Sequence, residues 1–344
     1  MSDGGWSVTA RQDAPRRRSH LAPWSRGVAW AVFLCLCAWS AEAQQQARRP
    51  ARIGVINAAY AASHPTVEGL KAGLRELGLE DGRDLTFDIR FTEGKLDAMP
   101  AAAEALVKAG VDVIFTSEEA ATQAARGATA SVPIVFTLVG DPMGAGIVEK
   151  LIQPGGNVTG VSSLQTELVA KRLEVLKTLA PTMRRVWIIF SGVDLSTAPM
   201  IARALDSARR MSLDVVPKGV LDGEELRRVL LEVRKGDAIL LAEGSNPDLA
   251  VSVIEGARTL HVPAMFGTAL WVGYGGLVSY GPDYYAQGVQ AAGLVAKILK
   301  GARPQDLPVE GAEKIDLAVN LKTAEQLDLT VPKKLLLRAD AFRR

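Results

Sequence analysis

The chain has 344 residues, with 40 lysine and arginine residues against 38 aspartate and glutamate residues and a formal net charge of +2 at pH 7. A nearly neutral chain has no overall electrostatic attraction to nucleic acid or to acidic lipid, so we expect no nucleic-acid partner. About 300 residues follow the atypical first segment, enough to build two domains with their own hydrophobic cores.

Residues 1–43 differ in composition from the rest of the chain. Arginines at 16–18 and at 26 precede an uncharged apolar run, 27–40, which is shorter than the roughly 20 residues needed to cross a bilayer. Ala41-Glu42-Ala43 then provides a small-x-small cleavage pattern. We predict a secretory signal peptide over residues 1–43 and a periplasmic location. A retained membrane anchor is the alternative, and the sequence leaves general and twin-arginine export both open.

Cleavage of this segment would change what chemistry the protein can perform. Both cysteines, Cys35 and Cys37, lie within it, so the exported chain would have neither a disulfide nor a thiol nucleophile. The histidines that would remain are His64 and His261. We find no G-x-S-x-G elbow and no H-E-x-x-H helix, so we predict no catalytic residues, no metal site and no cofactor. Carboxylate acid–base catalysis is the one enzymatic alternative left open.

From residue 52 onward, short apolar runs alternate with longer amphipathic stretches. Continuous apolar runs are typical of strands buried on both faces of a parallel sheet. Leucine and valine at helical spacing predict helices between them, one ended by Gly78 and another ended by Pro181. This alternation predicts βαβ units and an α/β fold. The predicted strands are Ile53–Ile56, Val111–Phe115, Pro133–Val139, Val186–Phe190, Ala238–Ala242 and Ile315–Val319.

Two turn-rich segments divide the strands and helices into two series. Residues 153–163 and 273–282 combine glycine or proline turns with a short extended stretch, as expected of a strand that leaves one sheet for another. We therefore predict two lobes joined by more than one strand. Lobe 1 comprises residues 52–161 plus 281–304, and lobe 2 comprises residues 162–280 plus 305–344.

The glycine-rich stretch FTLVGDPMGAG, residues 136–146, follows a predicted strand. Gly146 is followed by Ile147 rather than the lysine of a Walker A loop, and Glu149 stands where a dinucleotide fingerprint needs glycine or alanine. Both phosphate-binding motifs therefore fail. We predict instead that Asp141 caps a helix beginning at Pro142.

Small polar residues also follow other predicted strands, at Asn57, Ser117–Glu118, 191–196 and 243–246. The carboxyl ends of parallel strands form the ligand-binding edge of an open α/β sheet. Each residue alone is better explained as a helix cap. Together they predict a site for a small polar or zwitterionic molecule.

Several long stretches resemble the ABC-transporter substrate-binding protein family that includes tryptophan and tyrosine uptake proteins. They are IGVINAAYAASHPTVEGLKAGLRELG, VPIVFTLVGDPMGAGIVEKLIQPGGNVTGVS, LVAKRLEVLKTLAPTMRRVWIIFS, GGLVSYGPDYYAQGVQAAGLVAKILKGARPQDLPVE and LAVNLKTAEQLDL. The resemblance implies a type I periplasmic binding fold, with two Rossmann-like lobes, parallel sheets and a multi-strand hinge that closes on one ligand. It also implies delivery to an ABC permease in the inner membrane, powered by a separate ATPase.

Three short motifs of the family match positions in this sequence: its His-Pro pair matches His64 and the following proline, its Asp-Pro loop matches Asp141 and the following proline, and its Asp-Tyr pair matches Asp283-Tyr284. Residues 58–63 depart from the first loop of characterised aromatic-amino-acid binders, so the ligand cannot be copied from them. We predict a monomeric solute-binding protein; a periplasmic sensor that docks on a membrane receptor is the alternative. The predicted ligand contacts are Asn57, Tyr60, His64, Ser117, Glu118, Thr137, Asp141, Asp194, Ser196, Glu243, Asn246 and Phe266.

Overall fold

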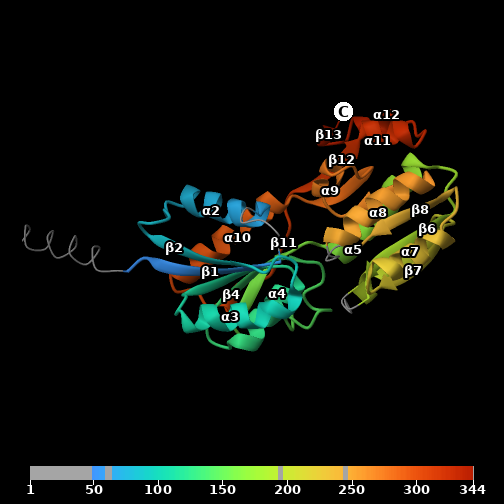
Figure 1. The fold of residues 1–344 in the computed structure, drawn as a ribbon. Helices are drawn as coiled ribbons and strands as arrows, with labels where there is room; N and C mark the ends of the chain where they lie inside the picture. Colours follow the sequence, from blue (N-terminus) through green and yellow to red (C-terminus); the bar gives the residue numbers. More distant parts are fainter. Residues whose placement is uncertain (1–48, 59–63, 193–196, 243–246, 344) are drawn as a thin grey trace, which may run out of the picture. The chain divides into compact units, whose positions relative to one another are not determined.

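The computed structural model describes residues 49–58, 64–192, 197–242 and 247–343 (Figure 1). The span Pro50–Arg344 forms one compact unit, and the predicted signal peptide lies outside the described residues. Within the described part of the chain, no helix has the length and apolar character required to cross a membrane.

The first sheet has six strands, and all of its pairings are parallel. Its central strands are buried along their whole length, as continuous apolar sequence predicts for a sheet covered on both faces. The strand order is β11 (Glu310–Gly311), β5 (Val158–Ser162), β4 (Ile134–Val139), β3 (Val113–Ser117), β1 (Ala51–Asn57) and β2 (Leu85–Phe91).

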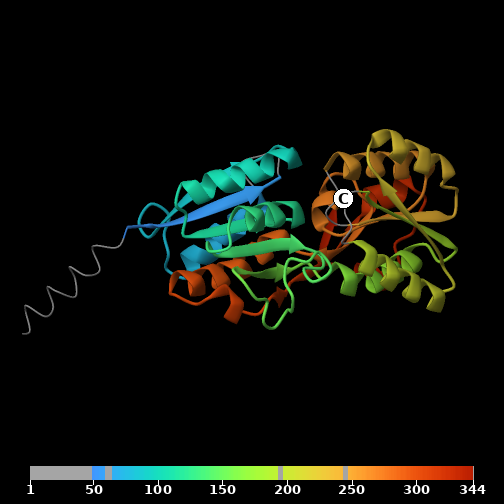
Figure 2. The ribbon, with the colours of Figure 1, turned by 90° about the horizontal axis from the view of Figure 1, so that it is seen from below.

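Helices cover both faces of the first sheet (Figures 1 and 2). On one face, α2 (Pro65–Glu76) and α10 (Tyr284–Leu299) form a core with β1 and β3. On the other face, α3 (Met99–Lys108) and α4 (Glu119–Ala128) form a second core. Gly78, with φ of 80°, follows the end of α2, as the sequence predicted.

The second sheet has seven strands, parallel except where β10 and β12 pair antiparallel. One of its cores contains α5 (Gln165–Leu179) and α6 (Ala198–Arg210), and the other contains α7 (Gly223–Glu232) and α8 (Pro247–Leu260). The strand order is β13 (Ala341–Arg343), β12 (Ile315–Asn320), β10 (Val278–Pro282), β9 (Ala264–Phe266), β8 (Asp237–Leu241), β6 (Arg185–Ser191) and β7 (Asp214–Val220).

The described chain passes between the two sheets three times. It leaves the first sheet after β5 to form α5, returns after β10 to form α10, and leaves again between β11 and β12. The prediction of two mainly parallel α/β sheets joined by more than one strand is therefore confirmed.

The predicted helix at Asp141 is wrong. Residues 142–146 form consecutive turns instead, with Ala145 N bonded to Asp141 O at 2.9 Å and Ile147 N bonded to Pro142 O at 2.9 Å. Gly146 adopts φ of 64°, which ends the turn before a second helical turn can form. Asp141 still caps the turn, since its Oδ1 accepts a hydrogen bond from Gly144 N at 2.8 Å.

The packing of α10 against α2 depends on glycines at the closest points of approach. A Cβ built on Gly69 would lie 2.0 Å from the carbonyl oxygen of Tyr285, and one on Gly288 would lie 2.0 Å from that of Thr66. No side chain fits at either distance. The two helix backbones are therefore in direct contact, which fixes α10 against the first sheet.

We expect Gly288→Ala to destabilise the protein by about 1–3 kcal/mol or more, because the added methyl group must push the helices apart. Gly293→Ala is the matched control in the same helix, since nothing lies within 4 Å of a Cβ there. It should stabilise by about 0.5–1 kcal/mol through helix propensity. Urea denaturation of both variants measures the difference, and equal stabilities would contradict this account of the contact.

Candidate functional site

Polar residues end adjacent strands at the carboxyl edge of the first sheet. Ser117 and Thr137 are register partners at the ends of β3 and β4. The Thr137 hydroxyl donates to the carbonyl of Thr116 at 3.3 Å, which joins the two strands through a side chain. Asn57 ends β1 at the same edge, and all four residues are fully buried.

A chain of hydrogen bonds links this edge to the start of α2. The Thr66 hydroxyl lies 2.9 Å from Ser117 Oγ and 2.7 Å from His64 Nδ1. The backbone of His64 is extended, with φ of −115° and ψ of 138°, as its position before Pro65 requires. The imidazole therefore caps α2 and is tied to the end of β3 through one intermediate hydroxyl.

The direction of these hydrogen bonds follows from the backbone. Thr66 N donates to His64 Nδ1 at 3.3 Å, so Nδ1 is an acceptor and a neutral ring carries its proton on Nε2. The Thr66 hydroxyl must then donate to Nδ1 and accept from the Ser117 hydroxyl. Burial lowers the pKa of His64 to about 4, so the ring is neutral at physiological pH. The network thus provides a donor at His64 Nε2 and an acceptor at Ser117 Oγ.

The His64 ring also packs against α10. Its centroid lies 6.1 Å from that of Tyr284, with an angle of 29° between the planes. Tyr284 is the first residue of α10, which follows the chain's return from the second sheet. The stacking therefore connects the start of α2 to that returning segment.

Glu118 lies between β3 and α4 in an unusual backbone conformation. Its φ of 78° and ψ of 161° fall in a region that is open essentially only to glycine. Its amide donates to the Thr137 carbonyl at 2.9 Å, and its own carbonyl accepts from the Thr122 hydroxyl at 2.7 Å. Although the side chain is only half-buried by exposed area, burial raises the pKa of the Glu118 carboxyl to about 7.

Leu138 forms a bulge beside Glu118. The β4–β5 register shifts between Phe136 and Val139, and Leu138 has φ of 58°. Gln287 of α10 compensates for the interrupted ladder, because its Oε1 accepts from Leu138 N at 3.2 Å. Its Nε2 lies 3.3 Å from Ser163 Oγ, just after β5.

Left-handed backbone at non-glycine residues therefore occurs next to the ends of three neighbouring strands. Glu118 follows β3, Leu138 lies in β4, and Leu164, with φ of 55°, follows β5. Such conformations cost about 1–3 kcal/mol each and are typical of functional sites. The strain supports this sheet edge as the candidate site.

Of the predicted contacts, the structure brings His64 and Ser117 together through Thr66 and places Thr137 and Glu118 beside them. Asp141 follows β4 and is half-buried. Phe266 is fully buried in the core that β8, α7 and α8 form. The other predicted contacts, Tyr60, Asp194, Ser196, Glu243 and Asn246, lie outside the described residues.

Sequence reasoning missed Thr66 and Gln287 as members of the site. Thr66 lies inside α2, where a threonine normally has no more than a local role. Gln287 is the one polar side chain among the buried positions of the described helix α10, and a polar residue on an otherwise apolar helix face is the signal that could have identified it. The partners of both residues are distant in sequence, at Ser117 and Leu138.

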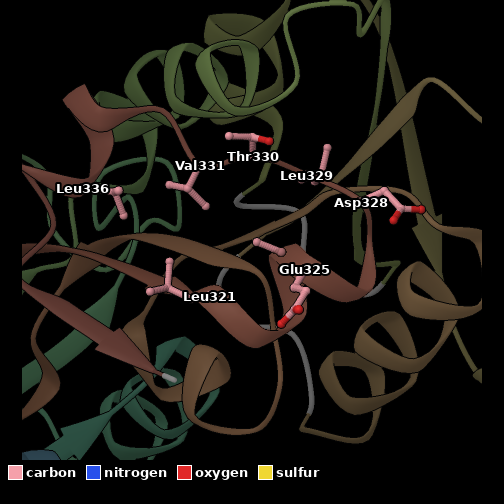
Figure 3. A pocket seen from close by; sticks show the side chains of 8 residues that line it. Leu321, Glu325, Asp328, Leu329, Thr330, Val331 and Leu336 are labelled. Carbon is pink, nitrogen blue, oxygen red and sulfur yellow. The ribbon is translucent and has the colours of Figure 1, made fainter.

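A separate pocket of about 470 Å³ lies in the C-terminal part of the chain (Figure 3). Side chains from α11 (Leu321–Gln326), from residues 328–331 and from α12 (Lys333–Leu336) surround it. Aliphatic groups and the carboxylates of Glu325 and Asp328 line it, and none of the predicted ligand contacts does. Among the residues that the structure describes, no cluster of histidine, cysteine, aspartate and glutamate could hold a metal ion.

Two mainly parallel sheets with three crossings are the arrangement of the type I periplasmic binding protein fold, which solved structures of other proteins share. The model of the ABC transporter substrate-binding protein family matches residues 55–343, and the chain belongs to this family. Its members bind a small molecule for an ABC transporter without transforming it, so the protein is not an enzyme. The resemblance found in the sequence is confirmed.

Three relatives illustrate the similarity. The tyrosine-binding protein of Clostridioides difficile strain R20291 is 28% identical over 274 residues, which cover 77% of this chain and 78% of that protein. A Streptococcus pneumoniae ABC domain in complex with L-Trp has 27% identity and a TM-score of 0.76. A conserved domain protein of Vibrio cholerae has 30% identity and a TM-score of 0.79. Each of these two structures covers 86% of this chain and is itself covered completely.

The pKa values of Glu118 and His64 predict opposite effects of pH on stability. Glu118 binds its proton more tightly in the folded than in the unfolded state. The stability that this proton contributes to the folded state is therefore lost as pH rises from about 4.5 to about 7. His64 binds its proton less tightly in the folded state, so its contribution is lost as pH falls from about 6.5 to about 4. Each effect amounts to about 3 kcal/mol at most.

Glu118→Gln and His64→Gln separate the two effects in urea denaturation at pH 4.5, 6 and 7.5. Glu118→Gln should gain stability relative to the natural chain as pH rises, and His64→Gln should gain as pH falls. Each variant serves as the other's control. A constant difference between Glu118→Gln and the natural chain across this range would show that the carboxyl does not titrate there.

Proposed function

We propose that this protein is the periplasmic solute-binding component of an ABC importer, and that its ligand is an amino acid or a similar small polar or aromatic solute. The observation that carries the proposal is the family match combined with two relatives. One is named as a tyrosine-binding protein, and the other was crystallised with L-Trp. Both ligands are aromatic amino acids.

The chemistry of the sheet edge supports a zwitterionic ligand. A donor at His64 Nε2 suits a carboxylate, whereas the Ser117 hydroxyl and the Glu118 carboxyl suit an ammonium group. In the mechanism we propose, these groups bind the ligand first. Residues that follow the strands of the second sheet complete the site on closure, among them Asp194, Ser196, Glu243 and Asn246.

The connectivity supports closure by a hinge. Lobe 1 would comprise residues 52–161 and 281–304, together with β11, which pairs with β5. Lobe 2 would comprise residues 162–280 and those residues of 305–344 that lie outside β11. Three crossing segments restrict the lobes to a bending motion, which is the usual closure of two-domain binding proteins. The closed form would then be recognised by an inner-membrane permease with a separate ATPase, and the binding protein itself would be a monomer.

A thermal-shift screen tests the ligand class. The exported form, residues 44–344, retains the whole compact unit from Pro50 onward. L-tyrosine or L-tryptophan at 100 times its Kd should add about 2.7 kcal/mol of stability, which corresponds to a rise of several degrees in Tm. The D-enantiomers serve as matched controls. The absence of a shift with any amino acid would overturn the proposed ligand class.

A further inference from the structure

We propose that Glu118 is the specificity-determining residue for a positively charged ammonium group on the ligand. This inference rests on the proposed function and deepens it, because it assigns one residue to one group of the solute. It also narrows the substrate class. Solutes that carry a protonated amine are bound, and otherwise identical solutes that lack the amine are rejected.

The first observation is that the Glu118 carboxyl has no partner among the residues that the structure describes. Within the described part of the chain it makes neither a hydrogen bond nor an ion pair. Two other acids of the described chain have partners. Asp141 accepts from Gly144 N at 2.8 Å, and Asp283 lies 2.6 Å from Lys314 Nζ. Glu118 is therefore an acceptor that is available to a partner from outside the described network.

The second observation is the electrostatic surroundings. Burial raises the pKa of Glu118, and no cation among the described residues contributes to the shift. Nearby His64 is neutral, since burial lowers its pKa to about 4. A half-buried carboxylate without a counter-ion is unfavourable, and a ligand ammonium would relieve this cost. The helix that Glu118 precedes, α4, carries Glu119 and Arg126; α3, which packs against α4, carries Glu104 and Lys108; and Asp141 follows β4.

The third observation is that the backbone at Glu118 would suit glycine better. Its φ of 78° and ψ of 161° impose a cost on any residue with a Cβ. A glycine would keep the backbone bonds to Thr137 and Thr122 without that cost. The side chain at this position therefore has a use that offsets the strain, and a carboxylate without a partner is suited to binding a cation.

Binding of an ammonium group favours the ionised form of Glu118, so binding and proton release are coupled. An acid with a pKa of about 7 is about one tenth ionised at pH 6 and about nine tenths ionised at pH 8. Affinity should therefore rise about tenfold over this interval. At pH 7, binding should release about half a proton per ligand, which calorimetry in buffers of different ionisation enthalpy measures directly.

Isothermal titration with matched ligands tests the assignment at pH 8. The ligand pairs are L-tryptophan with indole-3-propionate and L-tyrosine with 3-(4-hydroxyphenyl)propionate, which differ only in the amino group. Glu118→Gln should weaken amino-acid binding about 10- to 100-fold, as expected for a hydrogen bond to a charged group. The preference for the amine should nearly disappear in this variant, and so should proton release.

Two further variants separate recognition from folding. Glu119→Gln removes a charge from the next residue, in the first turn of α4, and should leave the amine preference and the proton release unchanged. Glu118→Gly should raise Tm by relieving the strained backbone while losing the amine preference. A variant that is more stable but less selective cannot be explained by misfolding.

The outcomes distinguish this inference from the proposed function. Equal affinity of the natural chain for an amino acid and its deaminated analogue would overturn the role of Glu118 alone. Undiminished selectivity in Glu118→Gln would do the same. Binding of tryptamine or tyramine without binding of any amino acid would overturn the proposed ligand class, while loss of that binding in Glu118→Gln would uphold the role of Glu118. No binding of any of these compounds would overturn both.

Discussion

The direct contact between the backbones of α2 and α10 is the constraint from which the candidate site follows. At Gly69 and at Gly288, a carbonyl oxygen of the opposite helix lies 2.0 Å from the place that a Cβ would occupy. Because α10 begins where the chain returns from the second sheet, this contact anchors the returning segment on the first sheet. It also sets the position of Tyr284 against His64 and of Gln287 against Leu138.

The site is therefore assembled from segments that are distant in sequence. Gln287 accepts the Leu138 amide that the bulge in β4 removes from the ladder, so α10 stabilises an irregular strand end. Thr66 connects α2 to β3 through a hydrogen bond between its hydroxyl and that of Ser117. Strained backbone at Glu118 persists because surrounding hydrogen bonds hold both of its peptide groups. The regular core thus supports an irregular, polar edge.

The sequence predicted the central strands because they are buried on both faces and read as continuous apolar runs. It did not predict β2 and β7, which lie at sheet edges and carry charged residues; β7 even contains Pro217, which an edge strand tolerates. The helix predicted at Asp141 failed because Gly146 ends the turn. The strand-end residues of the site were predictable from sequence. The connection through Thr66 and the strain at Glu118 were not, since both depend on contacts made in three dimensions.

The electrostatic character of the site suits reversible binding. His64 is kept neutral and Glu118 is kept near its point of half-ionisation at neutral pH, so neither of these two groups carries a full charge in the absence of ligand. A charged ligand gains binding free energy from its contacts with these groups, but deprotonating Glu118 offsets part of that free energy. In the proposed role of Glu118, the group that would select the ligand would also limit its affinity. A protein that must release its ligand to a transporter requires such a limit, because binding that is too tight would slow delivery.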